Sequence, residues 1–102
     1  MSTKHHQYRL TLEHEATTQP EQALHAPVTF SFANHDDLFA ILDRVRSAQV
    51  LPDEEAASLA LGVKLLGNVL LAHRHEPLFT ELWQAHSEFV QKLKSHSKAS
   101  AA

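Results

Sequence analysis

The stretch that decides the fold is Pro27-Val-Thr-Phe-Ser-Phe-Ala-Asn-His-Asp-Asp-Leu-Phe-Ala-Ile-Leu42. Its first half alternates apolar and polar residues, which is the pattern of a half-buried strand. Its second half places apolar residues at helical spacing behind the polar segment Asn-His-Asp-Asp. The sequence therefore predicts a strand over residues 28–32 that leads directly into a helix.

The start of this helix is predicted at Asn34. Asn is a favoured N-cap residue, and Asp37 three positions later completes a pattern similar to a capping box. Asp36 and Asp37 would then lie in the first turn, where carboxylates complement the positive end of the helix dipole. The helical pattern ends near Ser47.

A second strand is predicted upstream, over residues 8–12, because Tyr-Arg-Leu-Thr-Leu alternates in the same way. The segment between the strands, residues 13–27, is polar, contains two prolines and has no helical pattern. Without a crossover helix the two strands should pair antiparallel. This connection is longer than the two to five residues that are usual in hairpins, which is typical of functional or mobile loops.

Two further helices are predicted downstream. Pro52-Asp-Glu-Glu55 opens one that runs to about His73, with Pro and the acids suited to a first turn. This helix is apolar on most sides, so it should be the central helix of the fold or lie in a subunit interface. Gly62 and Gly67 each cost about 1 kcal/mol relative to Ala there, which indicates close approach of a neighbouring backbone. Pro77 opens the last helix, whose apolar residues keep helical spacing to Leu93.

The element order is therefore β-β-α-α-α, a β-hairpin followed by three α-helices in an α+β fold. A chain of 102 residues is one domain by length. We place that single domain at residues 1–94 and predict that the Ser-, Lys- and Ala-rich segment 95–102 is a disordered C-terminal tail.

Composition excludes several classes of function. The absence of cysteine excludes disulfides, thiolate metal sites and a Cys nucleophile. The net charge of −3 gives no reason to expect a nucleic-acid partner. The most apolar segment, Ala56 to Ala72, contains Lys64 and Asn68 and is at the short end for a spanning helix, so no membrane association is expected. The N-terminus has no apolar signal-peptide core, and we expect a cytoplasmic location.

A two-stranded ribbon leaves an unpaired edge on both strands. Pairing across a two-fold axis would remove one edge from each subunit. We therefore predict a homodimer, formed either through this edge or through the apolar stripe Leu61, Leu65 and Val69 of the middle helix.

Three segments resemble a family of small bacterial proteins of about this length: Tyr8-Arg-Leu-Thr-Leu-Glu13, Asn34-His-Asp-Asp-Leu-Phe39 and Leu59-Ala-Leu-Gly-Val-Lys-Leu-Leu-Gly67. That family is a domain of unknown function whose recognised signature is a His-Asp-Asp motif, and Pro77-Leu-Phe79 also fits its pattern. The resemblance covers roughly residues 8–93. It implies a bacterial cytosolic protein with one domain, and it supplies no activity, substrate or partner.

His35, Asp36 and Asp37 are the candidate ligand-binding residues. One imidazole and two carboxylates could hold a divalent cation or act as an acid–base cluster. Adjacent residues in a helical turn point about 100° apart, so a metal site would need distant ligands; the available residues are His25, His73, His75 and Glu76. The same three residues also suit a helix start with local hydrogen bonding.

Elsewhere the sequence shows no catalytic constellation, no metal site and no cofactor motif. His86 lies on the apolar seam of the last helix, which is typical of a half-buried histidine that donates to a backbone carbonyl. We therefore expect a non-enzymatic protein-interaction or regulatory module with a protein partner or self-association. The alternative is a protein that binds a small ligand, an anion or a divalent metal, and that could be hydrolytic, through His35, Asp36 and Asp37.

Overall fold

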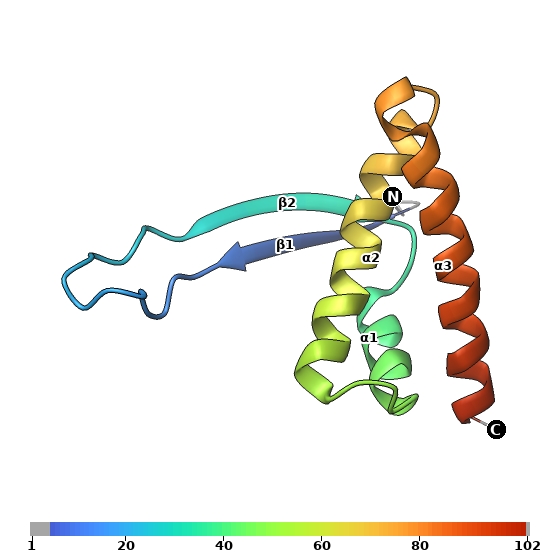
Figure 1. Cartoon of the computed structure of the whole chain (residues 1–102), viewed down its shortest axis with the longest axis horizontal. Coiled ribbons are helices and arrows are strands. Elements are labelled where there is room, and N and C mark those ends of the chain that lie inside the picture. The colour runs from blue at the N-terminus through green and yellow to red at the C-terminus, as the bar shows by residue number, and fades with distance from the viewer. Residues whose placement is uncertain (1–4, 102) are drawn as a thin grey trace. The chain divides into compact units, whose positions relative to one another are not determined.

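A computed structural model gives the structure of residues 5–101, the last five of them by backbone alone. Two strands, β1 (His6–Leu12) and β2 (Val28–Asn34), precede three helices, α1 (Leu38–Ser47), α2 (Asp53–His73) and α3 (Pro77–Ala101). Figure 1 shows the strands joined by a long loop and the helices following in chain order. The predicted β-β-α-α-α order and α+β class are confirmed.

The chain divides into two compact units, one that ends at Asp36 and one that begins at Asp37. The hairpin unit contains β1, β2 and their loop, and the helical unit contains the three helices. The helical backbone of α3 continues to Ala101, past the predicted domain end at residue 94. The single-domain bounds 1–94 and the disorder of residues 95–102 stay predictions, and Ala102 lies outside the described residues.

In the hairpin unit the two strands pair antiparallel, as predicted. The register places three apolar pairs on one face of the ribbon: Tyr8 with Phe32, Leu10 with Phe30, and Leu12 with Val28. The Tyr8 and Phe32 rings stack with centroids 5.5 Å apart. Cross-strand pairs of this kind are the unit of sheet stabilisation, and they fix the register of the ribbon.

The predicted start of the first helix at Asn34 is wrong. β2 extends through Asn34, and α1 begins at Leu38 with Asp37 as its N-cap. The Asn34 side chain is buried, and its Oδ1 accepts a hydrogen bond from the Asp36 N–H at 2.8 Å. This local Asx contact competes with helix capping, which explains why the cap falls three residues later. No acidic residue lies in the first turn of α1, contrary to the prediction for Asp36 and Asp37.

The core of the helical unit lies where α1 meets the N-terminal half of α2. Val45 of α1 packs on Ala56 and Ala60 of α2, and three partly buried side chains close the cluster: Ile41, Leu42 and Leu51. Two alanines on α2 allow the α1 side chains to approach its backbone. Further along α2, Leu70 is the one large side chain that is fully buried among the described residues.

The bounds of α2 agree with the prediction, but its burial within the chain is low. Among the described residues α2 alone has the length and apolar composition to cross a membrane, and 17% of its most apolar window is buried. The subunit-interface role of this helix stays a prediction.

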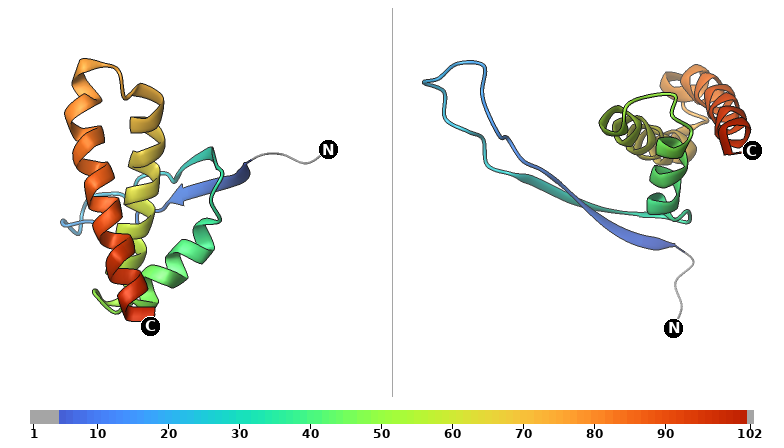
Figure 2. Two further views of the ribbon diagram at one scale, coloured as in Figure 1. Left: turned by 90° about the vertical axis from the view of Figure 1, so that its right-hand side faces the viewer. Right: turned by 90° about the horizontal axis from the view of Figure 1, so that it is seen from below.

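α2 and α3 run side by side in opposite directions, as Figure 1 and the left view of Figure 2 show. His86 of α3 contacts α2 and so defines which side of each helix faces the other. Its Nε2 lies 2.9 Å from the Val63 carbonyl oxygen, and its Cε1 lies 3.2 Å from the Cβ position of Gly67. The predicted half-buried histidine that donates to a backbone carbonyl is therefore confirmed. The close neighbour of Gly67 is the His86 ring, and not the neighbouring backbone that the sequence predicted.

Candidate functional site

His35 and Asp36 lie at the end of β2, in the hairpin unit. The backbone of Asp36 is held twice: its N–H donates to Asn34 Oδ1, and its carbonyl accepts from the Tyr8 hydroxyl at 2.9 Å. His35 Nε2 lies 3.3 Å from Asp36 Oδ1, with the two side chains 72% and 33% exposed. The ring of His35 also meets the ring of His5 edge-on, with centroids 6.3 Å apart. The imidazole of His35 thus lies at the surface, next to one carboxylate.

Asp37 is the first residue of the helical unit, and its carboxylate is engaged in capping. Oδ1 accepts hydrogen bonds from the N–H groups of Phe39 at 3.0 Å and Ala40 at 3.3 Å. This is the standard N-cap arrangement, which satisfies donors that the helix itself leaves without partners. The three candidate residues therefore divide between a surface His–Asp contact and a helix cap.

The described part of the chain holds no group of three or more His, Asp or Glu residues that could bind a metal ion. Of the distant ligands considered from the sequence, His73 and Glu76 contact each other at the C-terminal end of α2. An exposed His–Asp pair contributes little to stability because water screens it. Ligand binding at His35, Asp36 and Asp37 stays a prediction.

Substitution of Asp37 by Ala is expected to lower the free energy of unfolding by about 1 kcal/mol, because the N–H groups of Phe39 and Ala40 lose their acceptor. His35→Ala is the matched control. Because the His35 side chain is exposed, this substitution should change the free energy of unfolding by less than about 0.5 kcal/mol. Urea denaturation followed by circular dichroism measures both. If His35→Ala cost more than Asp37→Ala, the assignment of the cap would be wrong.

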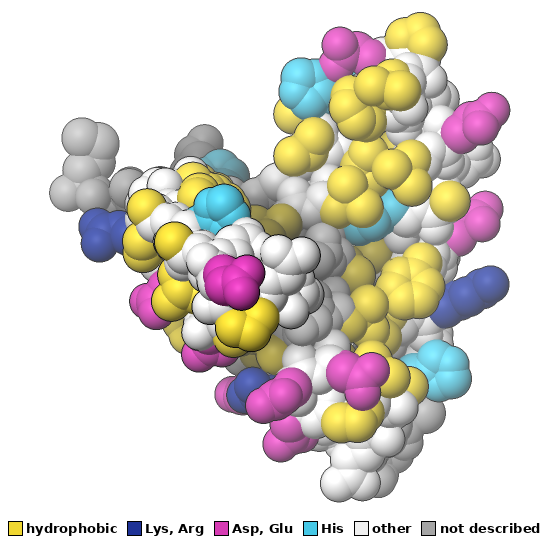
Figure 3. Space-filling model, turned by 60° about the vertical axis from the view of Figure 1, so that its left-hand side comes forward, with side chains coloured by type: hydrophobic (Ala, Val, Ile, Leu, Met, Phe, Trp, Pro, Cys, Tyr) yellow, Lys and Arg dark blue, Asp and Glu magenta, His cyan; other side chains and the backbone are white. Residues whose placement is uncertain are grey.

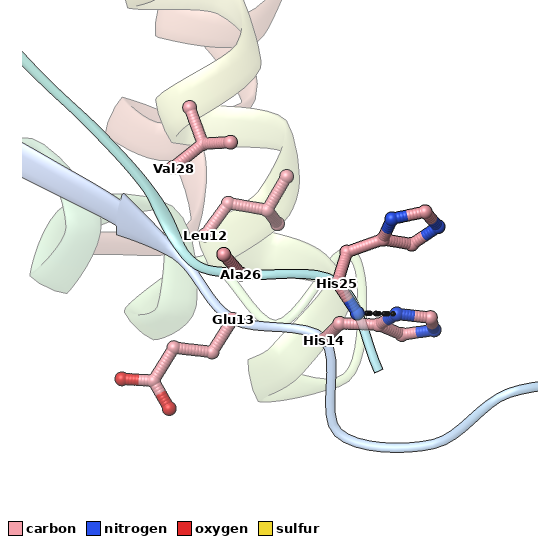
Figure 4. Close-up of a pocket in the computed structure, with 6 residues that line it drawn as sticks. All are labelled: Leu12, Glu13, His14, His25, Ala26 and Val28. Carbon is pink, nitrogen blue, oxygen red and sulfur yellow. Dashed lines mark hydrogen bonds between the residues drawn. The ribbon is translucent and has the colours of Figure 1, made fainter. Parts of the chain in front are cut away.

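A second polar cluster lies at the base of the 13–27 loop, and the sequence analysis missed it. A cavity of about 510 Å³ is lined by Leu12, Glu13, His14, His25, Ala26 and Val28. Figure 4 shows the imidazoles of His14 and His25 lying one over the other. Their centroids are 5.1 Å apart, and His14 Nδ1 accepts a hydrogen bond from the His25 N–H at 3.0 Å.

The contact between His14 and His25 stabilises the base of the loop. Because Nδ1 of His14 accepts, the proton of its neutral ring lies on Nε2. The bond and the ring stack hold the two arms of the loop together beyond the last strand pair, Leu12 with Val28. Glu13 points away from the rings in Figure 4, so the cavity has no carboxylate–imidazole pair for acid–base chemistry. The strand register brings these two residues together: His14 lies shortly after the end of β1 at Leu12, His25 lies shortly before the start of β2 at Val28, and Leu12 pairs with Val28.

Known proteins place the chain in a family without assigning it a role. The family described as a Domain of Unknown Function with solved-structure structure, DUF3861, matches residues 6–95. A crystal structure of a protein of unknown function from Pectobacterium atrosepticum is similar, with 31% sequence identity and a TM-score of 0.76 over 89% of this chain and 98% of that chain. No curated protein matches the chain. Since the family match covers both strands, α1, α2 and most of α3, the chain belongs to the DUF3861 family.

Proposed function

We propose that this chain is a non-enzymatic interaction module of the bacterial cytoplasm that works as a homodimer. The observation that supports the proposal most is that many more large hydrophobic side chains are exposed than buried. Twelve large hydrophobic side chains are exposed among the described residues, whereas only three residues larger than Ala are buried in the core: Leu38, Val45 and Leu70. Surfaces with so much open apolar area are typical of protein–protein contacts.

Both units contribute to this open apolar surface. On the ribbon, Leu12, Val28 and Phe30 are exposed on the face that carries the three apolar pairs. On the helices, the exposed side chains lie mainly on α2 and α3. A two-stranded ribbon needs further strands or packing for independent stability, so a partner suits the hairpin unit as well. Cysteine-free composition fits a reducing compartment, and the similar protein from Pectobacterium atrosepticum supports a bacterial setting.

Light scattering behind a size-exclusion column tests the proposal. At micromolar concentration we expect a particle of twice the chain mass of 11.4 kDa. A particle of one chain mass across the micromolar range would refute the homodimer.

The ligand-binding alternative has a separate test. A ligand of the native state raises the melting temperature by mass action, so a divalent cation or phosphate should raise it and His35→Ala should abolish that rise. The exposed His35–Asp36 contact and the capping role of Asp37 favour the interaction module over this alternative.

A further inference from the structure

The helical unit carries an apolar face that the described part of the chain leaves partly open to solvent. On α2 it consists of Gly62, Leu66 and Val69, and on α3 of Leu78, Leu82 and Phe89; we call these six residues the helix face. Their spacings, i, i+4, i+7 and i, i+4, i+11, each define one side of a helix. The five apolar side chains are between 40% and 81% exposed.

The two stripes form one surface. Val63 and Gly67 face α3 through His86, and the α2 stripe lies one residue earlier along the chain, at Gly62 and Leu66. On α3, Leu82 and Phe89 are offset from His86 in the same rotational sense. Because the helices run antiparallel, offsets in the same sense place both stripes on the same side of the pair. Figure 3 shows hydrophobic side chains gathered in a band along the helices, with charged side chains at its edges.

Gly62 gives independent evidence that another backbone approaches this face. A Cβ at Gly67 would meet the His86 ring, so packing within the chain explains that glycine. A Cβ at Gly62 would meet nothing within 4 Å. Glycine in a helix interior is costly relative to Ala, and close approach of a second helix is the usual gain. That second helix is not among the described elements of the chain.

Charge and area identify the occupant as a second copy. The first turn of α2 is acidic, with Asp53, Glu54 and Glu55, and its last turn holds His73 followed by Arg74. Two α2 helices packed antiparallel would place each acidic end beside the partner's basic end, whereas parallel packing would bring the acids together. At roughly 100 Å² for each half-exposed large side chain, the face supplies on the order of 500 Å² per copy. Half-buried neighbours such as Leu59 and Leu65 bring it towards the roughly 800 Å² per partner of a standard interface.

We propose that a second copy of this chain packs on the helix face, with α2 antiparallel to the partner's α2 about a two-fold axis between Gly62 and Leu66, so that α2 and α3 of both copies form a four-helix core. This inference rests on the proposed homodimer and adds the surface and the orientation. The polar rim and charge-free centre agree with the usual anatomy of such contacts.

Cross-linking tests the orientation. The chain contains no cysteine, so the single-cysteine variants L66C and Q84C report one position each. Residue 66 should lie beside its symmetry mate, and a short bismaleimide cross-linker should convert most of L66C into covalent dimer. Gln84 is exposed on α3 outside the helix face, and Q84C should stay monomeric on a denaturing gel. Equal yields from L66C and Q84C would overturn the helix face as the contact surface. Antiparallel packing also places the two copies of Glu54 at opposite ends of the α2 pair, so E54C should stay monomeric; efficient cross-linking of E54C would show parallel packing and overturn the orientation.

Two substitutions test the surface. Gly62→Leu and Leu82→Lys should each weaken the dimer at least tenfold in sedimentation equilibrium, because one fills the space for the partner helix and the other buries a charge. A Cβ at Gly62 meets nothing within 4 Å, and Leu82 is 45% exposed, so the helical circular dichroism of the monomer should be retained. The matched variant Ser47→Lys, exposed at the end of α1, should leave the dimer unchanged.

The outcomes separate the two proposals. A wild-type chain that is monomeric refutes the homodimer and this inference together. A wild-type dimer that resists both substitutions leaves the homodimer standing and overturns the helix face. Flotation of a monomeric wild type with phosphatidylglycerol vesicles would assign the face to a membrane and overturn the inference as well.

Discussion

Replacement of His86 by Ala is expected to lower the free energy of unfolding by about 2 kcal/mol, through two contributions. Loss of the hydrogen bond from Nε2 to the Val63 carbonyl oxygen costs about 1 kcal/mol. Removal of the half-buried ring leaves a gap between α2 and α3 and costs a further amount of about 1 kcal/mol. Because the contact joins residues far apart in the sequence, its loss loosens the helix pair as a whole.

Urea denaturation of the wild type and variants measures this effect. His86→Phe keeps most of the ring volume and loses the hydrogen bond, so it should cost about half as much as His86→Ala. His96→Ala is the control, since His96 is an exposed residue of the same helix and its removal should change little. If His86→Ala and His96→Ala were equal, the contact with Val63 would have no part in holding the helices together.

Features set by patterns within one segment of the chain could be predicted from the sequence, whereas features set by contacts between distant residues could not. The bounds of α2 and the start of α3 were predicted closely because Pro52 and Pro77 mark the starts and the apolar spacing continues for several turns. The end of α3 was not, because its Ser-, Lys- and Ala-rich last turns carry no apolar pattern. The strand pairing was also predicted, because alternation in residues 8–12 and 28–32 assigns the same face to each partner. These patterns need no knowledge of distant contacts.

The helix start failed because two good capping residues compete there. Asn34 and Asp37 are equally plausible N-caps by type, and the choice depends on the buried Asn34 side chain bonding to the Asp36 N–H. The burial of Asn34 depends on tertiary contacts, which the local sequence does not specify. The sequence also grouped His35, Asp36 and Asp37 because they are neighbours in the chain, whereas the structure leaves His35 beside Asp36 and gives Asp37 a separate capping role.

The His14–His25 contact was beyond sequence reasoning for a different reason. The two residues lie at opposite ends of a polar loop, and their pairing depends on how far the ribbon continues past Leu12 and Val28. Composition alone could not select this pair from nine histidines. The sequence also suggested the same explanation for Gly62 and Gly67, a neighbouring backbone. The structure separates them, because a Cβ at Gly67 would meet the His86 ring and a Cβ at Gly62 would meet nothing within 4 Å.

Gly67 gives the second large expected effect. Its Cβ position lies 3.2 Å from Cε1 and 3.7 Å from Nε2 of His86, and the ring cannot retreat without lengthening its bond to Val63. Gly67→Leu should therefore lower the free energy of unfolding by about 2 kcal/mol, because overpacking outweighs the gain in helix propensity of about 1 kcal/mol.

Combining this substitution with His86→Ala separates overpacking from any other cause. Removing the imidazole makes room for the Leu side chain, so the double variant Gly67→Leu/His86→Ala should be more stable than the sum of the single effects by about 1 kcal/mol or more. Gly62→Ala is the matched control on the same helix. At a protein concentration below the dissociation constant of the dimer, it should raise stability by up to about 1 kcal/mol, because its Cβ meets nothing within 4 Å. Additive effects of Gly67→Leu and His86→Ala would mean that the two residues do not touch in solution, and the packing of α3 on α2 would have to be revised.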